Sequence, residues 1–339
     1  HYENAYRLSQ KLEVEYPKPE GIIVAGMGGS AIGGEILKDW SRDLLDVPVE
    51  VCRDYNLPAY AGRKTLVFTV SYSGETEETL SAFIQSIKRR CLIVCIGSGG
   101  SLIRFADKIG LPYIKVPDGM PPRAALPYLL TPMLVCIEKM GLVSTFSEEM
   151  AEALSVIKEV CEENSPEKPL EECFAKDLAS KLNGKIPVVY GFGFYRSVVQ
   201  RFKQQFNENS KVPSKWEVFP ELNHNEIVGW EKAQFDNFSA VIIRDKDEPE
   251  EIRNRIEATK KLIDNKVAGV HEIWSRGKGK LAKILSTVLT GDFTSVYLAI
   301  LRGVDPTPVR TIDLLKSEVA KLGIKDVILR KLNEMAENH

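Results

Sequence analysis

The chain has 339 residues, of which 44% are hydrophobic and 27% are charged; this is the composition of an ordinary globular protein of about two domains. Its formal net charge of −2 offers no electrostatic basis for binding nucleic acid or an anionic membrane, so neither is expected as a partner. The unbroken apolar runs fall well short of the ~18 residues of a membrane-spanning helix. The polar N-terminal segment lacks the apolar core of a signal peptide, so we expect a cytoplasmic protein.

The first half of the chain alternates short apolar runs with helical patterns. The apolar runs are rich in Val and Ile and mostly do not alternate with polar residues, which is typical of parallel strands buried on both faces. Strands are predicted at Gly21–Ala25, Val49–Arg53, Thr65–Val70, Leu92–Ile96 and Pro112–Val116. Helices are predicted at Ala31–Trp40, Thr76–Arg89, Leu102–Ile109, Ala124–Met140 and Ser147–Glu162.

A polar stretch broken by prolines, Glu162–Glu172, is interpreted as the connection between two domains, at residues 1–160 and 173–339. The second half repeats the same rhythm. Strands are predicted at Ile186–Gly191, Trp216–Phe219, Ala240–Arg244 and Val267–Ile273. Helices are predicted at Tyr195–Glu208, Pro249–Asn265, Leu281–Gly303 and Ile312–Leu322. The pattern therefore predicts an α/β protein of two doubly wound, parallel-sheet domains with additional C-terminal helices, and it suggests a duplication.

The strand predicted at Thr65–Val70 ends in three hydroxyl residues, Ser71, Ser73 and Thr76, at the start of the next helix. Free backbone N–H groups and the helix dipole favour an anion there. No lysine or arginine lies between residues 65 and 87, which favours a small phosphorylated metabolite over a nucleoside triphosphate. Three glutamates in this segment suit a helix start, but they repel a dianion unless they point outward. The alternative is that the hydroxyls only cap the helix.

The segment Gly26–Ala31, GMGGSA, follows a predicted strand and opens a helix. It matches a loose GxGxxA dinucleotide fingerprint, with Glu50 as the ribose partner, but a tight turn that needs glycine explains it equally well. Because the carboxyl ends of parallel strands share one sheet edge, Ser30 and the hydroxyls after Val70 are expected to converge on one ligand.

Four further residues are candidates for chemistry. Arg123 lies among prolines and glycine and is either a cation facing a developing oxyanion or an ordinary surface arginine. Glu208 ends a helix among amides, which orient a carboxylate as a general base without neutralising it. His224 lies in a loop of asparagines and glutamates and suits a proton shuttle, whereas His271 in an apolar strand favours a packed core role. Lys316 is either functional or a solvated surface residue.

Metal binding is not expected from the sequence. The four histidines show no HxxxH or HxH spacing, and none of the six cysteines forms a CxxC pair. Most of the cysteines lie in apolar surroundings and are interpreted as small core residues. Cys161 and Cys173 flank a charged segment, and a disulfide between them is left open.

Six ordered motifs together are specific. They are GMGGS at Gly26–Ser30, SYSGETEET at Ser71–Thr79, PPRAA at Pro121–Ala125, FNENSK at Phe206–Lys211, ELNHNE at Glu221–Glu226 and the DPTPV…IDLLK ending. With these motifs the chain resembles, over nearly its whole length, the archaeal-type bifunctional phosphoglucose/phosphomannose isomerases. These are a branch of the phosphoglucose isomerase superfamily, built from flavodoxin-like sugar-isomerase domains.

The resemblance implies a sugar-phosphate site in the N-terminal domain. Ser71, Ser73 and Thr76 match its phosphate-binding loop, with Ser30 and Gly29 beside it. The family acts on hexose 6-phosphates, and it implies neither a metal nor a redox cofactor.

The resemblance also implies the catalytic roles. Glu208 matches the base that moves a proton between C1 and C2, Arg123 the cation that stabilises the enediolate, and His224 with Lys316 the pair that assists ring opening. In this family the histidine comes from the neighbouring subunit, which implies a homodimer with a shared active site. A C-terminal threonine is credited with space for both C2 epimers, and the alignment leaves it open between two residues, Thr307 and Thr311.

The implied function is interconversion of glucose 6-phosphate and mannose 6-phosphate with fructose 6-phosphate through a cis-enediol. A non-catalytic sugar-phosphate-binding regulator of the same fold is the main alternative, but it has no need of Glu208, His224 and Lys316 together. A second alternative is a glucosamine-phosphate-forming isomerase, which requires an ammonia source that the sequence does not indicate. A nucleotide-dependent oxidoreductase rests on the GxGxxA loop alone.

Overall fold

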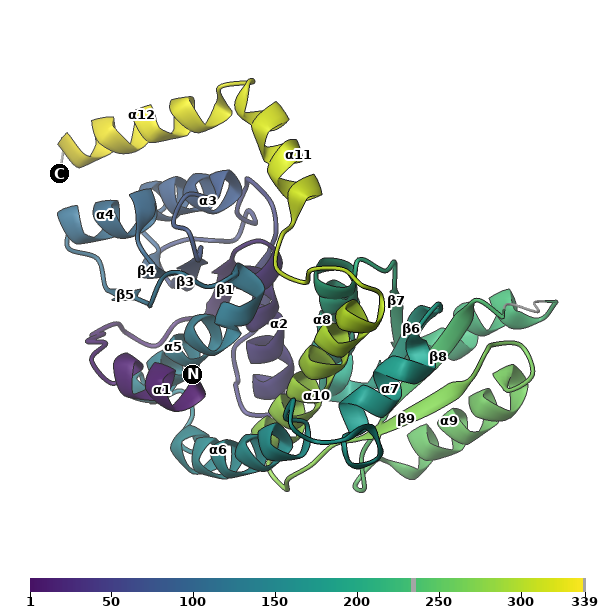
Figure 1. Ribbon diagram of the computed structural model, residues 1–339. Coiled ribbons are helices and arrows are strands. Elements are labelled where there is room, and N and C mark those ends of the chain that lie inside the picture. Colours follow the sequence, from purple (N-terminus) through teal and green to yellow (C-terminus); the bar gives the residue numbers. More distant parts are fainter. Residues whose placement is uncertain (233–235, 338–339) are drawn as a thin grey trace. The chain divides into compact units, whose positions relative to one another are not determined.

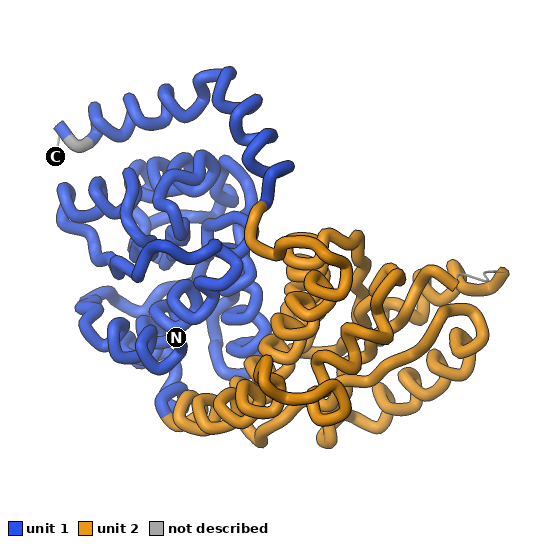
Figure 2. The backbone as a smooth tube through the Cα atoms, viewed as in Figure 1, with its two compact units in different colours: residues 1–147, 309–339 blue, residues 148–308 orange. Residues whose placement is uncertain are grey.

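The computed structural model describes residues 1–232 and 236–337 and contains two compact units (Figures 1 and 2). Unit 1 comprises His1–Ser147 together with Val309–His339, and unit 2 comprises Glu148–Pro308. The chain therefore leaves unit 1, forms unit 2 and returns to unit 1. Each unit has its own parallel β-sheet, which confirms the predicted α/β class.

Unit 1 is built on a five-stranded parallel sheet with the strand order β2-β1-β3-β4-β5. The strands are β1 (Gly21–Ala25), β2 (Val49–Cys52), β3 (Thr65–Val70), β4 (Leu92–Gly97) and β5 (Tyr113–Lys115). β1 and β3 are buried along their whole length, with Gly21 opposite Thr65 and Ala25 opposite Thr69. Burial on both faces explains why their sequences are continuous apolar runs.

Helices cover both faces of this sheet (Figure 1). They are α1 (Tyr2–Ser9), α2 (Gly28–Ser41), α3 (Glu77–Lys88), α4 (Gly100–Lys108), the 3₁₀ turn η1 (Pro122–Ala125) and α5 (Leu126–Lys139). α3 and α4 share a core cluster with β4 on one face. α2 and α5 pack together, and α2 lies against the other face, where a Cβ built on Gly34 would be 2.7 Å from Val24 Cγ1. Glycine at this position therefore lets α2 approach the sheet closely.

The last two helices of the chain, α11 (Arg310–Ala320) and α12 (Ile324–Glu337), belong to unit 1. Ile328 and Leu332 of α12 are buried in the cluster with α3 and α4, because their i, i+4 spacing places both on one helix face. α11 has no buried residue. The predicted second domain, at residues 173–339, included this C-terminal segment, whereas in the structure the segment packs with unit 1. The division into functional domains stays a prediction.

Unit 2 is built on a four-stranded parallel sheet with the order β7-β6-β8-β9, which repeats the order of the first four strands of unit 1. The strands are β6 (Ile186–Phe192), β7 (Lys215–Phe219), β8 (Phe238–Arg244) and β9 (Val270–Trp274). The longer helices are α6 (Phe146–Glu163), α7 (Phe174–Leu182), α8 (Arg196–Gln205), α9 (Glu250–Ile263) and α10 (Lys280–Leu301). Short helical turns are η2 (Leu170–Glu172), η3 (Gly193–Tyr195), η4 (Phe206–Ser210), η5 (Glu221–His224) and η6 (Glu226–Trp230).

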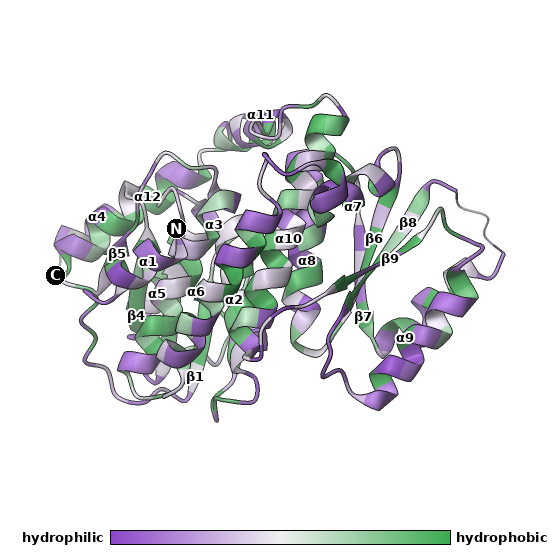
Figure 3. Ribbon diagram, turned by 60° about the horizontal axis from the view of Figure 1, so that its bottom comes forward, coloured by the Kyte–Doolittle hydropathy of each residue, from purple (hydrophilic) through white to green (hydrophobic). Residues whose placement is uncertain are grey.

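α10 is long and apolar enough to cross a membrane by length and composition, but most of its apolar stretch is buried inside unit 2. It packs against α7 and α8. Figure 3 colours much of α10 as hydrophobic and much of α9 as hydrophilic. α10 is therefore the core helix of this unit.

The proline-broken stretch predicted to connect the domains lies inside unit 2, because α6 before it is already bound there. The Glu152 carboxylate accepts hydrogen bonds from the backbone N–H groups of Lys278 (2.6 Å) and Gly279 (2.9 Å). Arg276 forms ion pairs with Glu159 and Glu163. These contacts with the segment before α10 attach α6 to unit 2, so the division between the units falls at its N-terminal end.

Candidate functional site

The loops after β1 and β3 meet at the carboxyl edge of the unit 1 sheet. β1 and β3 are neighbours, but their following helices lie on opposite faces, which makes this edge a topological switch point, the usual ligand position in such sheets. The backbone N–H of Tyr72 donates to Ser30 Oγ at 3.3 Å. A Cβ built on Gly26 would lie 2.9 Å from the Val70 carbonyl oxygen. The two loops therefore lie side by side, whereas their convergence on one ligand stays a prediction.

The hydroxyl loop surrounds the N-terminus of α3. Ser71 is fully buried, and its Oγ lies 2.9 Å from Oγ1 of Thr76, which is the N-cap residue of α3. Ser73 is exposed, and its Oγ accepts a hydrogen bond from the backbone N–H of Glu75 at 3.2 Å. Hydroxyls and helix N–H groups of this kind suit a phosphate dianion.

Glu75 is turned away from this loop toward α4 and α12. Its Oε1 accepts from the Ser101 N–H (2.7 Å) and the Ser101 Oγ (2.9 Å), and its Oε2 lies 2.8 Å from Lys325 Nζ. Partial burial opposes ionisation, but these hydrogen bonds outweigh it and hold the pKa of Glu75 below its ordinary value. The charge of Glu75 is therefore compensated by Lys325 and Ser101, so this carboxylate does not oppose an anion at the hydroxyl loop.

Arg123 lies beside the N-terminus of α2. A Cβ built on Gly29 would be 2.9 Å from the Pro122 carbonyl oxygen and 3.2 Å from the Arg123 nitrogen, so only glycine permits this approach. Arg123 is 6% exposed, which excludes the interpretation as an ordinary surface arginine. A buried guanidinium within the same unit as the hydroxyl loop fits a role in holding negative charge.

Glu208 lies in η4, a five-residue π-helical segment that continues α8. Such segments occur mostly as single turns and frequently at functional sites. The helix before it is fixed to α10: Arg201 Nε and Nη2 donate to the two carboxylate oxygens of Asp292 at 3.0 and 2.7 Å, and Gln205 Nε2 donates to Asp292 Oδ1 at 2.8 Å. Bidentate pairs of this kind add geometric specificity.

The segment itself is also bound to α10. Asn209 Nδ2 donates to Ser295 Oγ at 2.9 Å, and Ser210 Oγ donates to the Ser295 carbonyl oxygen at 2.6 Å. Both contacts are buried, and they flank Glu208 on its C-terminal side. The backbone that carries Glu208 is therefore held on a rigid element, as a general base requires.

The remaining candidates are at the surface. His224 ends η5 and is exposed in unit 2. The Thr307 backbone N–H donates to Asp305 Oδ1 at 2.8 Å in the same unit. Thr311 and Lys316 are exposed on α11 in unit 1. The hydroxyl loop and Arg123 also belong to unit 1, whereas Glu208 belongs to unit 2, so the roles of these residues remain predictions.

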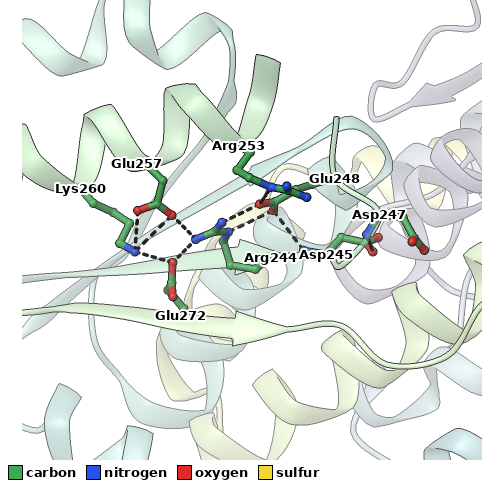
Figure 4. A network of polar contacts seen from close by, with 8 residues as sticks. All are labelled: Arg244, Asp245, Asp247, Glu248, Arg253, Glu257, Lys260 and Glu272. Atoms are coloured by element: carbon green, nitrogen blue, oxygen red, sulfur yellow. Dashed lines mark hydrogen bonds and ion pairs between the residues drawn. The ribbon is translucent and has the colours of Figure 1, made fainter. Parts of the chain in front are cut away.

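Sequence reasoning did not predict a charged network that lies at the corresponding sheet edge of unit 2. The Arg244 guanidinium contacts Glu248 (2.6 Å), Glu257 (2.8 Å) and Glu272 (Figure 4). Arg244 and Glu248 are both buried. Arg244 ends β8, and Glu248 and Glu257 follow it in a run of mixed acidic and basic residues, which is usually a solvated face. No local signal marks the buried pair.

Next to this network a second cluster closes the edge. Tyr195 Oη donates to Asp245 Oδ2 at 2.6 Å and lies 2.7 Å from Ser275 Oγ. Lys283 Nζ donates to Asp245 Oδ1 at 2.9 Å and to Asp247 Oδ2 at 2.6 Å. The hydrogen-bonding groups that converge here are paired with one another.

The other candidates are structural. His271 lies partly buried on the edge strand β9 with its Nε2 3.1 Å from Ser239 Oγ, and burial lowers its pKa, so it is hydrogen-bonded as predicted but lies outside the buried core. Cys161 and Cys173 are both free thiols, so they do not form a disulfide. Within residues 1–232 and 236–337, no group of three His, Cys, Asp or Glu side chains is arranged to hold a metal ion.

Comparison with known proteins first defines the class. The family described as "Bacterial phospho-glucose isomerase C-terminal SIS domain" matches residues 171–319. A hypothetical protein from Thermus thermophilus has a similar structure, with a TM-score of 0.74 over 94% of this chain and 86% of that chain at 17% sequence identity. Together with the two parallel sheets, these matches define the sugar-isomerase (SIS) fold of phosphosugar isomerases.

Sequence relatives then define the family. A bifunctional phosphoglucose/phosphomannose isomerase from Caldicellulosiruptor bescii is 41% identical over 94% of this chain and 96% of its own. A protein of the same name from Aquifex aeolicus is 36% identical over 89% of this chain and 91% of its own. The chain belongs to the family of bifunctional phosphoglucose/phosphomannose isomerases, which confirms the resemblance inferred from the six motifs.

Proposed function

We propose that this protein interconverts glucose 6-phosphate and mannose 6-phosphate with fructose 6-phosphate. The observation that carries the proposal is the meeting of two loops at the switch point of unit 1, where hydroxyls and a helix N-terminus offer donors for a phosphate. The relatives from Caldicellulosiruptor bescii and Aquifex aeolicus, whose names state both activities, support the same substrates.

The phosphate end of the substrate binds at the hydroxyl loop in this proposal. Ser71, Ser73 and Thr76 donate to the phosphate oxygens, and the N–H groups at the start of α3 add the helix dipole. Ser30 and Gly29 lie on the neighbouring loop, close enough for Ser30 to contact the Tyr72 backbone. Binding energy from this remote group positions the sugar for reaction.

The chemistry moves one proton between neighbouring carbons. Glu208 removes the proton from C2 of the open-chain aldose, the electron pair forms the C1–C2 double bond, and negative charge develops on O1. Return of the proton to C1 with transfer of the hydroxyl proton from O2 to O1 gives the ketose. Arg123 holds the negative charge of the enediolate, and His224 with Lys316 moves protons between O5 and O1 during ring opening.

The proposal includes a homodimer in which His224 comes from the neighbouring subunit. His224 is exposed, and α11 carries Ile312, Leu314 and Leu315 with 40%, 67% and 63% of their surfaces exposed. Apolar residues on a helix with no buried side chain favour a second protein surface as their partner. A second copy of the chain provides such a surface and completes the site.

The first test measures turnover of both aldose phosphates, by coupled assay and by deuterium exchange at C2 in D₂O. We expect Glu208→Gln to lower kcat by ~10²–10⁴-fold with little change in KM, because the amide cannot accept the proton. Glu251→Gln, a similar change at an exposed position of α9, is the matched control and keeps wild-type rates. Near-normal turnover by Glu208→Gln, or binding without turnover by the wild type, would sink the proposal.

Mixing two inactive variants tests the shared site. In a mixed dimer of Glu208→Gln and His224→Ala subunits, one of the two sites contains both native residues if the histidine crosses the interface. Random reassortment then restores about a quarter of the wild-type activity. If the histidine acts within its own subunit, the mixture stays inactive.

A further inference from the structure

Lys211 follows the π segment that carries Glu208, and its backbone is left-handed, with φ 56° and ψ 39°. Within the described ranges, Arg90 and Lys211 are the non-glycine residues with positive φ. An L side chain is disfavoured in this conformation, and glycine or asparagine is usual at such a helix end. The backbone conformation at this position therefore does not explain why the residue is a lysine, and the explanation must lie in its side chain.

The ammonium group of Lys211 makes three hydrogen bonds to backbone carbonyl oxygens. Lys211 Nζ donates to the carbonyl oxygens of Glu208, of Pro308 at 2.8 Å and of Pro306 at 3.3 Å. The first is a terminal carbonyl of the π segment, where a cation complements the helix dipole. The other two lie almost a hundred residues further along the chain. One side chain thus joins two distant segments of unit 2.

The second segment holds Thr307 between these two prolines. Prolines have no N–H, so the carbonyl oxygens are the backbone groups through which this segment can be hydrogen-bonded on either side of Thr307. The Thr307 N–H is held by Asp305 Oδ1 at 2.8 Å. Thr307 is therefore fixed by Asp305 through its own nitrogen and by Lys211 through its two neighbours.

We infer that Lys211 is a positioning residue that sets the distance between Thr307 and the base Glu208 and thereby tunes the preference between the two C2 epimers. The inference rests on the proposed function. Glucose 6-phosphate and mannose 6-phosphate differ only in the arrangement at C2, which is the carbon from which Glu208 removes the proton. A side chain held at a fixed distance from this base is suited to distinguish the two arrangements, and a loose one is not.

The test replaces the ammonium and compares the two substrates. Lys211→Met is expected to lower kcat by roughly 10- to 100-fold, as loss of an outer support does, with KM changed far less. It is also expected to change the ratio of kcat/KM for mannose 6-phosphate to that for glucose 6-phosphate by at least about fivefold. Lys211→Arg, which keeps a cationic donor, restores part of the loss. The matched control, Lys261→Met at an exposed position of α9, behaves as the wild type.

The outcomes separate this inference from the proposed function. A wild-type enzyme that turns over neither sugar phosphate overturns both. A wild-type enzyme that is active, with a Lys211→Met variant whose substrate ratio stays at the wild-type value, overturns the inference alone, even if its melting temperature falls. If Lys211→Met does not fold, Asp305→Ala loosens Thr307 from its other side and must shift the same ratio, while Asp305→Asn, which keeps the acceptor oxygen, must shift it less.

Discussion

The two units share a strand order, but the carboxyl edges of their central strands carry different groups. In unit 1 this edge is lined by hydroxyls, glycines and the start of α3. In unit 2 the same edge is filled by Tyr195, Asp245 and Lys283, with the Arg244 network beside it. The same topology therefore carries an edge of hydrogen-bond donors in unit 1 and a closed, ion-paired edge in unit 2.

The difference shows that the strand order fixes where a ligand can bind and the side chains decide whether one does. In unit 2 each charge faces an opposite charge within the protein, so the edge is already neutralised and serves stability. In unit 1 the carboxylate of Glu75, within the hydroxyl loop, is bound instead by Ser101 and Lys325. The predictions below test whether stability and binding are separated in this way.

The largest effect is expected from breaking the buried pair in unit 2. Arg244→Met leaves Glu248 without its main partner and should lower the free energy of unfolding by about 3–5 kcal/mol in urea titrations. Glu248 is fully buried as a side chain, and its contact with Arg253 is longer, at 3.4 Å. Arg253→Met is therefore the control and should cost less than about 1 kcal/mol. A tenfold change in KM for Arg244→Met would contradict the separation, because unit 2 would then take part in phosphate binding.

The next effect concerns the hydroxyl loop of unit 1. Thr76→Val removes a donor from the proposed phosphate site and should raise KM for both substrates by about 10- to 100-fold, which corresponds to the loss of a hydrogen bond to a charged group. Thr79→Val is the matched control on the same helix. Its buried hydroxyl has no hydrogen-bond partner in the described part of the chain, so kinetics and stability should stay close to those of the wild type. Equal KM values for the two variants would mean that the Thr76 hydroxyl does not contact the phosphate and only pairs with Ser71.

The smallest effect is expected at Glu75. Its pKa lies below the ordinary value of 4.5, so its contacts stabilise the fold above that pH and this contribution is lost as the pH falls through the lowered pKa. Lys325→Met should cost about 0.2–1 kcal/mol at neutral pH, because the pair is partly exposed, and flatten the acid side of the stability profile. Lys331→Met, on the same helix, is the control and should keep the wild-type profile. Identical acid limbs for the wild type and Lys325→Met would show that this ion pair is not formed in solution.

The strands were the most predictable part of the fold. Gly21–Ala25 and Thr65–Val70 were predicted with their observed bounds, because strands buried on both faces are continuous apolar runs between polar turns. α1, α7 and α12 were not predicted. α7 directly follows the polar stretch interpreted as a connection, and α12 shows only a narrow apolar stripe of residues such as Ile328 and Leu332 in a highly charged segment.

The helix predicted at Tyr195–Glu208 contains a 3₁₀ turn, α8 and the π segment. Hydrophobic periodicity does not distinguish the three kinds of helix, because over a single turn each places its apolar residues on the same side of the helix axis. The hydroxyl loop was predictable because its chemistry is local. The contacts of Lys211 and Lys325 were not, because each joins residues that are far apart in the sequence.

The return of the chain to unit 1 has a consequence for the order in which the protein is made. Residues 148–308 form a complete unit before residues 309–337 have been synthesised, whereas unit 1 lacks α12 until residues 324–337 have been added (Figure 2). Lys325 is synthesised after all of unit 2, so Glu75 in the hydroxyl loop lacks this partner while unit 2 is being made. The hydroxyl loop of the nascent chain therefore carries the charge of Glu75 without its ammonium partner until residue 325 has been added.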